Sequence, residues 1–459
     1  MTLITNALSG AQAAQVALNT TSQNIANVMT AGYTRQGVLL RSVQPSRSGV
    51  AAAGDGVASP SLFRFSDSYK NLQLWQSNTQ LGQHSVAQPY LTQMEQVMGN
   101  DDASIATGLD NFFASLNAAS VEPTSTPLRD GVIGAAQALA QRFNSLRQTL
   151  SSQQAAVSQQ RQDLVTQVNG QAAEIADLNK RIAAAQAGGM NASGLIDQRD
   201  QKIDSLSSLV GVQVVTQPDG STNVSLSGGQ PLVVGQLNSA LTLTTQPDGS
   251  QVMALKFASE SFGVNTTQMG GELGGLADFE SQQLKPMVQS LQDMAKGLAD
   301  GVNSVLSAGY TMSGAAGKPM FIFDPTSSTA MLKVDPTLQA ADLGLSGSAT
   351  EPGNSDQLLA LIALKQQPVA ISSLGNVLLG DVYTQLVGRV GMASQSNQTA
   401  MDTAQTVRDQ ADANWKATSG VNEDEEAVNL MQYQQMYQAN MKVVSVANDL
   451  FDSLLSMIR

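Results

Sequence analysis

Three aspartates, Asp197, Asp200 and Asp204, form the grouping of carboxylates best suited to chemistry in this sequence. A pair of carboxylates can perform acid–base chemistry such as glycoside hydrolysis. These three residues, however, share one predicted helix with Arg199 and Lys202. Mixed charges on a helix usually form a solvated face whose ion pairs contribute little stability. We therefore predict an exposed charged face at this place. The sequence does not forbid glycoside hydrolysis by an acid pair, but nothing in it points there.

The other side chains that commonly catalyse reactions or bind metals are nearly missing. The chain has no cysteine and a single histidine, His84, which excludes thiolate catalysis, disulfides, histidine-based triads and multi-histidine metal sites. The glycine cluster at 270–275 lacks the sequence of a phosphate-binding loop or a dinucleotide fingerprint. It is expected to be a flexible joint. We predict no catalytic, cofactor-binding or metal-binding residue, and we do not expect an enzyme.

Composition points instead to long helices in an acidic protein. The 459 residues suffice for about two to four domains, and only 4% of them are aromatic and 13% charged. The net charge of −13 opposes binding to nucleic acid or anionic lipid. The longest apolar run, 358–364, is far shorter than the roughly 20 residues that span a bilayer, so no membrane insertion is expected. Residues 1–18 lack a secretory signal, so export is expected to retain the N-terminus.

The N-terminal segment predicts one helix with a single apolar stripe. The helix is expected to end near Gly32, which suits a left-handed cap. Between the stripe positions lie mostly Asn, Gln, Ser and Thr, which are mediocre helix formers, so the helix needs a partner that buries its stripe. Spaced three and four residues apart, the stripe consists of Ile4, Ala7, Ala11, Ala14, Leu18, Thr21, Ile25 and Val28.

The C-terminal segment predicts a more apolar helix. Asn422 and Glu425 form a start that resembles a capping box, and the acids at 423–426 lie where the helix dipole favours negative charge. Two apolar stripes follow side by side, so the apolar face is too wide for one partner helix. The stripes consist of Ala427, Leu430, Gln434, Tyr437, Met441, Val444, Asn448, Phe451, Leu455 and Ile458, and of Tyr433, Met436, Val443, Ala447, Leu450 and Leu454.

The two ends carry opposite charge. Residues 1–50 contain three arginines and no acidic residue, whereas residues 420–459 contain six acidic and two basic residues. Short segments can reach such a balance by chance. The alternative is that the ends lie against each other, or against neighbouring copies, with opposite potentials facing.

The middle of the chain predicts a bundle of long helices. Segment 279–305 is the expected antiparallel partner of a first long helix, and a third helix is expected from about 374 to 415. The first helix is expected to stop at Gly188 and Gly189. Its apolar register consists of Leu139, Phe143, Leu146, Leu150, Val157, Leu164, Val168, Ile175, Leu178 and Ile182.

A β-rich region is inserted between the first two of these helices. The hexapeptide Thr-Gln-Pro-Asp-Gly-Ser occurs at 216–221 and again at 245–250, each time between short β-rich runs. Pro-Asp-Gly favours a turn, so the two copies support two hairpins. A second stretch that is rich in loops, 308–354, has room for a few more strands.

We therefore predict a mainly α fold with inserted β structure. The N- and C-terminal helices form a coiled-coil-like inner domain, long helices form a bundle in the middle, and small β hairpins are inserted. The predicted boundaries are 1–55 with 418–459 for the terminal assembly domain, 56–205, 265–307 and 355–417 for the bundle, 206–264 for the β-rich insertion, and 308–354 for the segment of loops and short strands.

Both ends resemble a known family. Residues 7–10, 22–27 and 32–36 (Gly-Tyr-Thr-Arg-Gln) are similar to a signature shared by bacterial flagellar rod, hook and hook-associated proteins. The run 419–427 and the pattern Tyr-Gln-Gln, Tyr-Gln-Ala and Phe-Asp-Ser-Leu-Leu that follows it resemble the hook-associated proteins of the hook–filament junction. Interior segments agree in order, at Phe112-Phe113 with Pro123 and Arg129, at 195–200, 230–235, 271–276 and 308–310.

The resemblance implies a secreted structural subunit of the bacterial flagellum. Such proteins assemble at the distal end of the hook and form the junction on which the filament is built. They leave the cell through the flagellar type III export channel without cleavage. The implied partners are further copies of the chain in a ring or helical assembly, the hook protein, the next hook–filament junction protein, and a flagellar export chaperone that binds the C-terminal helix. Residues 310–354 are too short for the large outer domain of longer members.

The stripes of the terminal helices are the expected subunit contacts. In the monomer these helices are expected to be poorly ordered, because nothing covers their stripes, and in the assembly they are buried by neighbouring copies. The predicted interface residues are Ile4, Leu8, Ala11, Leu18, Ile25, Tyr33, Leu430, Tyr433, Tyr437, Val444, Asn448, Leu450, Phe451, Leu454 and Leu455.

Other functions remain as alternatives. Another flagellar axial subunit, such as a hook, rod or filament-like protein, shares part of the C-terminal pattern, and the interior matches favour the junction. A type III translocator that inserts into host membranes needs a long apolar hairpin, which the sequence lacks. An enzyme that trims the cell wall during assembly is the third alternative.

Overall fold

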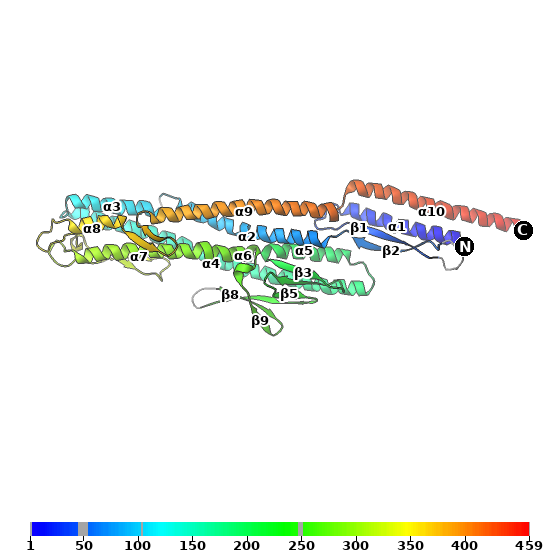
Figure 1. The fold of residues 1–459 in the computed structure, drawn as a ribbon, viewed down its shortest axis with the longest axis horizontal. Coiled ribbons are helices and arrows are strands. Elements are labelled where there is room, and N and C mark those ends of the chain that lie inside the picture. Colours follow the sequence, from blue (N-terminus) through cyan, green and yellow to red (C-terminus); the bar gives the residue numbers. More distant parts are fainter. Residues whose placement is uncertain (1, 45–53, 102–103, 247–250, 459) are drawn as a thin grey trace.

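The computed structural model describes residues 2–44, 54–101, 104–246 and 251–458. The molecule is elongated, and both chain ends lie together at one end of it (Figure 1). Long helices make up the rest of its length, and a β-rich insertion projects from their side. This arrangement has the predicted mainly α character with inserted β hairpins.

Two helices and a hairpin form the terminal unit. Helix α1 (Thr2–Ala26) packs against α10 (Glu423–Ile458), and strand β1 (Gln36–Ser42) pairs antiparallel with β2 (Val57–Arg64) beside α1. The amide of Asn24 hydrogen-bonds Glu426, and Gly10 lies against Asn440, so the two helices run antiparallel. A Cβ atom at Gly10 would lie 2.5 Å from Asn440 Oδ1, which shows how closely the helices approach there.

The terminal unit differs from the prediction in two places. Helix α1 ends at Ala26 and not near Gly32, because consecutive turns over residues 27–33 lead the chain into β1, and Gly32 takes a positive φ of 72° there. Strand β2 was expected in the bundle. It pairs with β1 along its length and so forms part of the hairpin beside α1.

Antiparallel and crossing helices form the bundle. Helix α4 spans 62 residues along it, and α2 lies against α9 (Figure 1). The bounds are Ser68–Met98 for α2, Ile105–Val121 for α3, Thr126–Ala187 for α4, Ser193–Leu209 for α5, Gly271–Phe279 for α6, Lys285–Ala308 for α7, Asp356–Ala363 for α8 and Val382–Ser419 for α9. A π-helical turn over Glu280–Leu284 joins α6 to α7.

One apolar core runs through the bundle and reaches under the insertion. Every residue of the predicted α4 register is buried, which confirms that register, and the helix stops at Gly188 as predicted. Among the described residues, no side chain of α1, β1, β2 or α10 belongs to this core. The terminal unit is therefore not joined to the bundle by a shared apolar core.

Two predictions about the bundle are wrong. The expected third helix was to start at about residue 374, but β12 (Pro368–Ile371) and β13 (Gly375–Leu378) form a hairpin there, and α9 begins at Val382. The glycine cluster is not a flexible joint. Gly271 and Gly275 are buried in α6, and a Cβ at Gly275 would lie 2.1 Å from the carbonyl oxygen of Gln83, so these glycines allow close packing.

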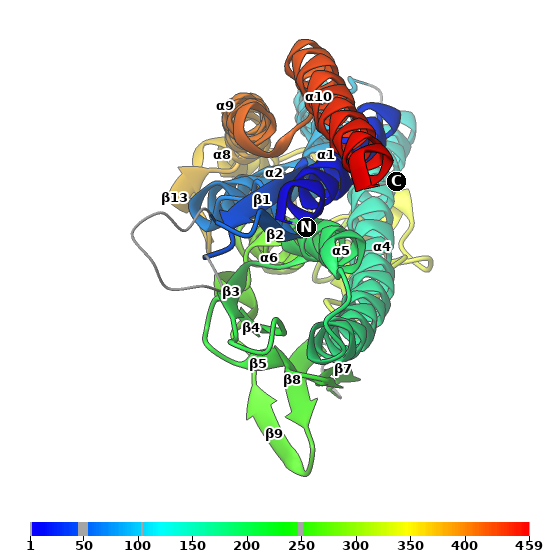
Figure 2. The same cartoon turned by 90° about the vertical axis from the view of Figure 1, so that its right-hand side faces the viewer.

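The insertion consists of two antiparallel sheets, and Figure 2 shows β8 and β9 projecting away from the helices. The first copy of the hexapeptide is a turn between β3 and β4, with Gly220 at a φ of 77°, as predicted. Residues 247–250 of the second copy lie outside the described residues. The strand bounds are Val212–Thr216, Thr222–Leu226, Pro231–Val234 and Leu237–Asn238 for β3 to β6, Ala240–Thr245, Gln251–Phe257 and Glu260–Gly263 for β7 to β9, and Phe321–Phe323 and Leu332–Val334 for the separate pair β10 and β11.

Candidate assembly and junction site

An uncovered row of apolar side chains runs along α10. Because Asn24 faces Glu426 and Gly10 faces Asn440, the same register places residue 448 opposite the start of α1. Residues 449–458 therefore extend past the partner helix, as Figure 1 shows. We call the exposed side chains of α10 the assembly face: Val428, Leu430, Met431, Met441, Val443, Val446, Leu450, Phe451, Leu454, Leu455 and Met457.

The predicted interface residues fall into three groups by exposure. Ala11 is buried inside the terminal unit, because the alanines of α1 are the small residues on which α10 and the hairpin pack, so the structure does not place it on the surface. Half-buried residues are Ile4, Leu18, Ile25, Tyr33, Tyr433, Tyr437 and Val444. Exposed residues are Leu8, Leu430, Asn448, Leu450, Phe451, Leu454 and Leu455.

Asn24 joins α1, β1 and α10 through four hydrogen bonds. Its side-chain oxygen accepts from the Tyr33 hydroxyl (2.9 Å) and from the backbone N–H of Gln36 (3.1 Å). Its amide nitrogen donates to the Gln36 carbonyl (2.9 Å) and to Glu426 Oε2 (3.1 Å). Burial, together with the negative charges of Asp197 and Glu426, raises the pKa of Tyr33 to about 12, so its hydroxyl stays a hydrogen-bond donor. The buried asparagine thus fixes how α1 and α10 sit on the hairpin.

Arg35 brings the two oppositely charged ends of the chain together. Its guanidinium pairs with Glu425 (2.5 Å) and lies 4.1 Å from the ring centroid of Phe65. Its backbone N–H donates to the carbonyl of Ser419, at the end of α9. The Asn422 side chain accepts from the N–H of Asp424 and of Glu425, so it caps α10 as predicted. Glu425 thus forms an ion pair with Arg35 and also lies in the capped first turn of α10.

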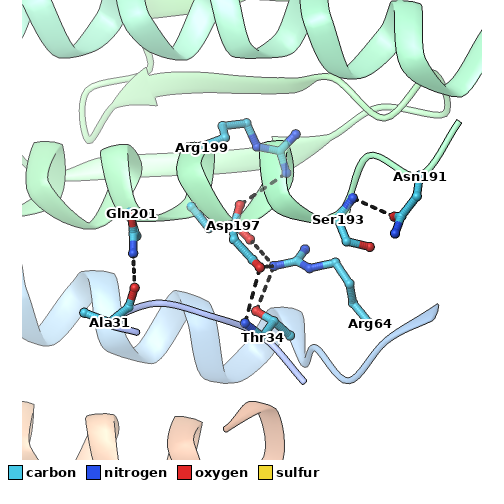
Figure 3. A network of polar contacts seen from close by, with 9 residues as sticks. Ala31, Thr34, Arg64, Asn191, Ser193, Asp197, Arg199 and Gln201 are labelled. Atoms are coloured by element: carbon cyan, nitrogen blue, oxygen red, sulfur yellow. Dashed lines mark hydrogen bonds and ion pairs between the residues drawn. The ribbon is translucent and has the colours of Figure 1, made fainter. Parts of the chain in front are cut away.

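A buried polar cluster attaches the terminal unit to α5, as Figure 3 shows. We call it the junction network: Thr34, Arg64, Asp197, Arg199 and Asp200. The guanidinium of Arg64 binds Asp197 (2.5 Å), Asp200 (3.1 Å) and the hydroxyl of Thr34 (2.9 Å). The backbone N–H of Thr34 donates to Asp197 (3.3 Å). Residues from three separate segments therefore meet at one pair of carboxylates.

The junction network also reaches the β insertion. Arg199 binds Asp200 (3.2 Å) and donates to the carbonyl of Gly220 (2.8 Å), in the turn between β3 and β4. Burial raises the pKa of Asp197, which Arg64 opposes, and burial lowers the pKa of Arg199, which Asp200 opposes. One set of charges thus links the terminal unit, the bundle and the insertion.

The predicted exposed face on α5 is wrong for the residues of this network. Asp197 is 7% exposed and Arg199 is 5% exposed. Only Lys202, which pairs with Glu174, forms the exposed ion pair that the sequence suggested. The acids face inward because they pair with Arg64. This arginine lies more than a hundred residues earlier in the chain. No local pattern in the sequence indicates such a partner.

A groove of about 780 Å³ lies beside the network, between the terminal unit and the bundle. Residues 27–33 form one side, and Trp75 of α2, Asp204 of α5 and Trp415 of α9 line the others. We call it the junction groove. Asp204 accepts a hydrogen bond from Asn78 (2.7 Å). Burial, reinforced by Asp412 and opposed by Arg408 and by the bond from Asn78, raises the pKa of Asp204 to about 6.

Replacement of Asp204 by asparagine is expected to stabilise the protein at neutral pH. The carboxyl binds its proton more tightly in the folded state than in the unfolded chain, so the parent loses stability as the pH rises from about 4 to about 6. Asp204→Asn lacks this loss. We expect its free energy of unfolding to exceed that of the parent by roughly 2 kcal/mol at pH 7.5 and to equal it near pH 4. Urea unfolding at both pH values checks this, and an equal difference at the two values would contradict it.

The remaining candidate residues have structural places. His84 of α2 lies with its Nδ1 3.0 Å from Asn397 Oδ1 of α9, and so it helps to join these two helices. In the described ranges, His, Asp and Glu side chains do not gather in groups of three that suit a metal ion. A helix long and apolar enough to cross a membrane is not found in the described part of the chain either.

Comparisons with known proteins agree along the chain. The family model of the flagellar hook-associated protein FlgK helical domain matches residues 91–321. Models of the flagella basal body rod protein and of the flagellar basal body rod FlgEFG protein C-terminal region match residues 4–34 and 417–457. Both ends of the chain are thus similar to a wider set of flagellar proteins, and the middle is similar to one family.

Full-length relatives and a solved structure are similar as well. Flagellar hook-associated protein 1 of Salmonella typhimurium is 28% identical, with 99% of each chain covered, and that of Bacillus subtilis is 28% identical, with 97% of this chain and 96% of the relative covered. The structure of the flagellar hook junction protein FlgK from Burkholderia pseudomallei superposes with a TM-score of 0.68 at 19% identity, over 76% of this chain and all of that one. This last likeness shows the fold.

Proposed function

The chain belongs to the family of the flagellar hook-associated protein FlgK, and we propose that it assembles at the distal end of the hook as the structural subunit of the hook–filament junction. The observation that carries this proposal is the assembly face. Leu450 is 57% exposed and Phe451 is 61% exposed, on the end of α10 that extends past α1. A soluble protein rarely leaves such a row uncovered unless a partner covers it.

The assembly face supplies the free energy for joining other subunits. Burial of one large apolar side chain contributes roughly 1.5–3 kcal/mol. Ordering one residue costs about 1–2 kcal/mol, so the ends of the chain become fully stable only when most of the face is covered. Assembly is then cooperative, and it is confined to the growing tip, where neighbouring copies already offer their own terminal helices.

The same face accounts for the proposed partners. Further copies of the chain, the hook protein and the next junction protein cover it in the assembled flagellum. Before export, a flagellar chaperone binds α10 and keeps the face from associating in the cytoplasm. Because α10 is the most exposed apolar element of the terminal unit, it is the element that needs such cover.

We propose a structural role without catalysis. Asp197 and Asp200, the carboxylates best suited to chemistry, are held by Arg64 and Arg199 in the junction network. A general acid or nucleophile has to reach a substrate, and these carboxylates instead bind the chain's own side chains. The network serves to orient the terminal unit.

Imaging of flagella from a deletion strain tests this function. We expect complete hooks without filaments, and filament protein released into the medium, because the surface on which the filament grows is missing. The parent gene supplied on a plasmid should restore filaments. Normal filaments in the deletion strain would contradict the proposal. Missing or shortened hooks would indicate a hook or rod subunit, the alternative that the matches at both ends leave open.

A further inference from the structure

The hairpin of the terminal unit carries a second uncovered surface. Leu39, Leu40 and Arg41 are consecutive and all exposed, although side chains of a strand normally alternate between its two faces. The cause is a register shift between Leu39 and Arg41, where the pairing with β2 is interrupted. Arg41 forms no ion pair within the described residues. The result is a short apolar strand edge that ends in a free cation.

The junction groove has the opposite character. Trp75 and Trp415 provide apolar walls. Its two cations, Arg408 and Lys416, both pair with Asp412, at 3.6 Å and 2.7 Å. Asp204 forms no ion pair in the described part of the chain, and burial raises its pKa although Arg408 and the hydrogen bond from Asn78 oppose that rise. The groove thus offers apolar contact next to one unpaired acid.

These two surfaces cannot meet within one chain. Arg41 pairs with Ala58 next to Val57, whose N–H donates to Ser9 of α1, whereas the groove begins at residue 27, beyond the other end of that helix. At 1.5 Å per residue, the distance along α1 from Ser9 to the end of the helix next to the groove is about 25 Å. The cation of one copy therefore reaches a groove only in another copy.

We infer that the edge Leu39–Arg41 of one copy docks in the junction groove of a second copy, with Arg41 beside Asp204. The edge matches the groove in character, because it combines apolar side chains with a cation and the groove combines apolar walls with an unpaired acid. The inference rests on the proposed function and adds to it the partner of a surface outside the assembly face.

The contact sets the kind of assembly. Because the two surfaces are different, each copy keeps one free edge and one free groove after a first contact. Such head-to-tail contacts close into a ring or continue as a helix, whereas a contact between identical surfaces stops at a dimer.

Disulfide trapping in the cysteine-free chain tests the docking. Leu40→Cys combined with Ser205→Cys places one thiol on the edge and one at the groove. In isolated flagella of a complemented deletion strain, we expect multimers of this chain that disappear on reduction. Leu40→Cys alone and the pair Lys180→Cys with Ser205→Cys are the matched controls, and they should stay monomeric. Normal filaments with only monomeric double variant would overturn the inference, as would a cross-link to hook protein instead of to this chain.

Charge variants give a second readout. Arg41→Glu is expected to yield about tenfold fewer filaments, and Arg41→Lys close to the parent number, because lysine keeps the charge. Lys180→Glu, on an exposed part of α4, is the control and should assemble normally. Parent-like filament numbers for Arg41→Glu would sink the inference while leaving the junction function intact. That function fails on its own terms if the deletion strain still builds filaments.

Discussion

Replacement of Leu450 and Leu454 by aspartate is expected to abolish filament formation while the bundle stays folded. Both side chains are more than half exposed, and both lie in the part of α10 that extends past α1. Covering them in the assembly contributes about 1.5–3 kcal/mol each, and burying unpaired carboxylates instead would cost several kcal/mol. Secreted double variant should fail to join hooks. Electron microscopy of the complemented deletion strain measures this.

The matched control is Val407→Asp, a change at an exposed apolar residue of α9 that lies outside the terminal unit. This variant should assemble as the parent does. Circular dichroism of each purified protein should show the same thermal unfolding, because none of the replaced side chains belongs to the bundle core. A double variant that still carries filaments in normal number would show that the assembly face does not drive assembly.

The second large effect is expected at the junction network. Asp197→Ala leaves the Arg64 guanidinium largely buried without its shortest ion pair, and leaves the N–H of Thr34 without an acceptor. Removal of one partner of a buried ion pair costs about 3–5 kcal/mol. Because no apolar core joins the terminal unit to the bundle, this loss should detach the unit locally and leave the bundle folded.

Hydrogen exchange checks this result. Amides of residues 31–36 should lose protection in Asp197→Ala, while those of α4 keep theirs. Glu174→Ala is the control, because it removes an exposed ion pair with Lys202 on the same helix α5, and such pairs contribute at most about 1 kcal/mol. Unchanged protection at residues 31–36 in Asp197→Ala would mean that the network does not hold the junction.

Periodicity in the sequence predicted the helices that are buried along one side. The α4 register and its stop at Gly188 follow from apolar spacing and glycine, which are local signals. The first Pro-Asp-Gly turn and the Asn422 cap are local as well, and the structure confirms both. The apolar stripes of the terminal helices were also visible, since they follow the same three-four spacing.

The parts that the sequence did not predict depend on distant partners. Asp197 looks like a surface residue beside Lys202, and only folding brings Arg64 to it. The hairpin at 368–378 replaces the start of the helix that was expected from about residue 374, because its strands pair with each other and β12 packs on α7. The glycines of α6 are explained by the backbone of α2 and the end of α5, which lie against them.

The terminal unit thus has one set of side chains that attaches it to the bundle and another that is exposed. The junction network and Arg35 orient the terminal unit on the bundle with buried polar contacts. The assembly face remains free for neighbouring copies. The central claim is that this face finds cover only in the assembled flagellum.

Hydrogen exchange of α10 in two states tests that claim most directly. In the dilute, purified monomer we expect the amides of residues 449–458, which extend past α1, to exchange within seconds to minutes, because this end of the helix opens readily. In isolated hook–filament complexes the same amides should be protected for hours, because neighbouring copies bury the face. Full protection of α10 in the monomer, unchanged by concentration or by assembly, would contradict the account.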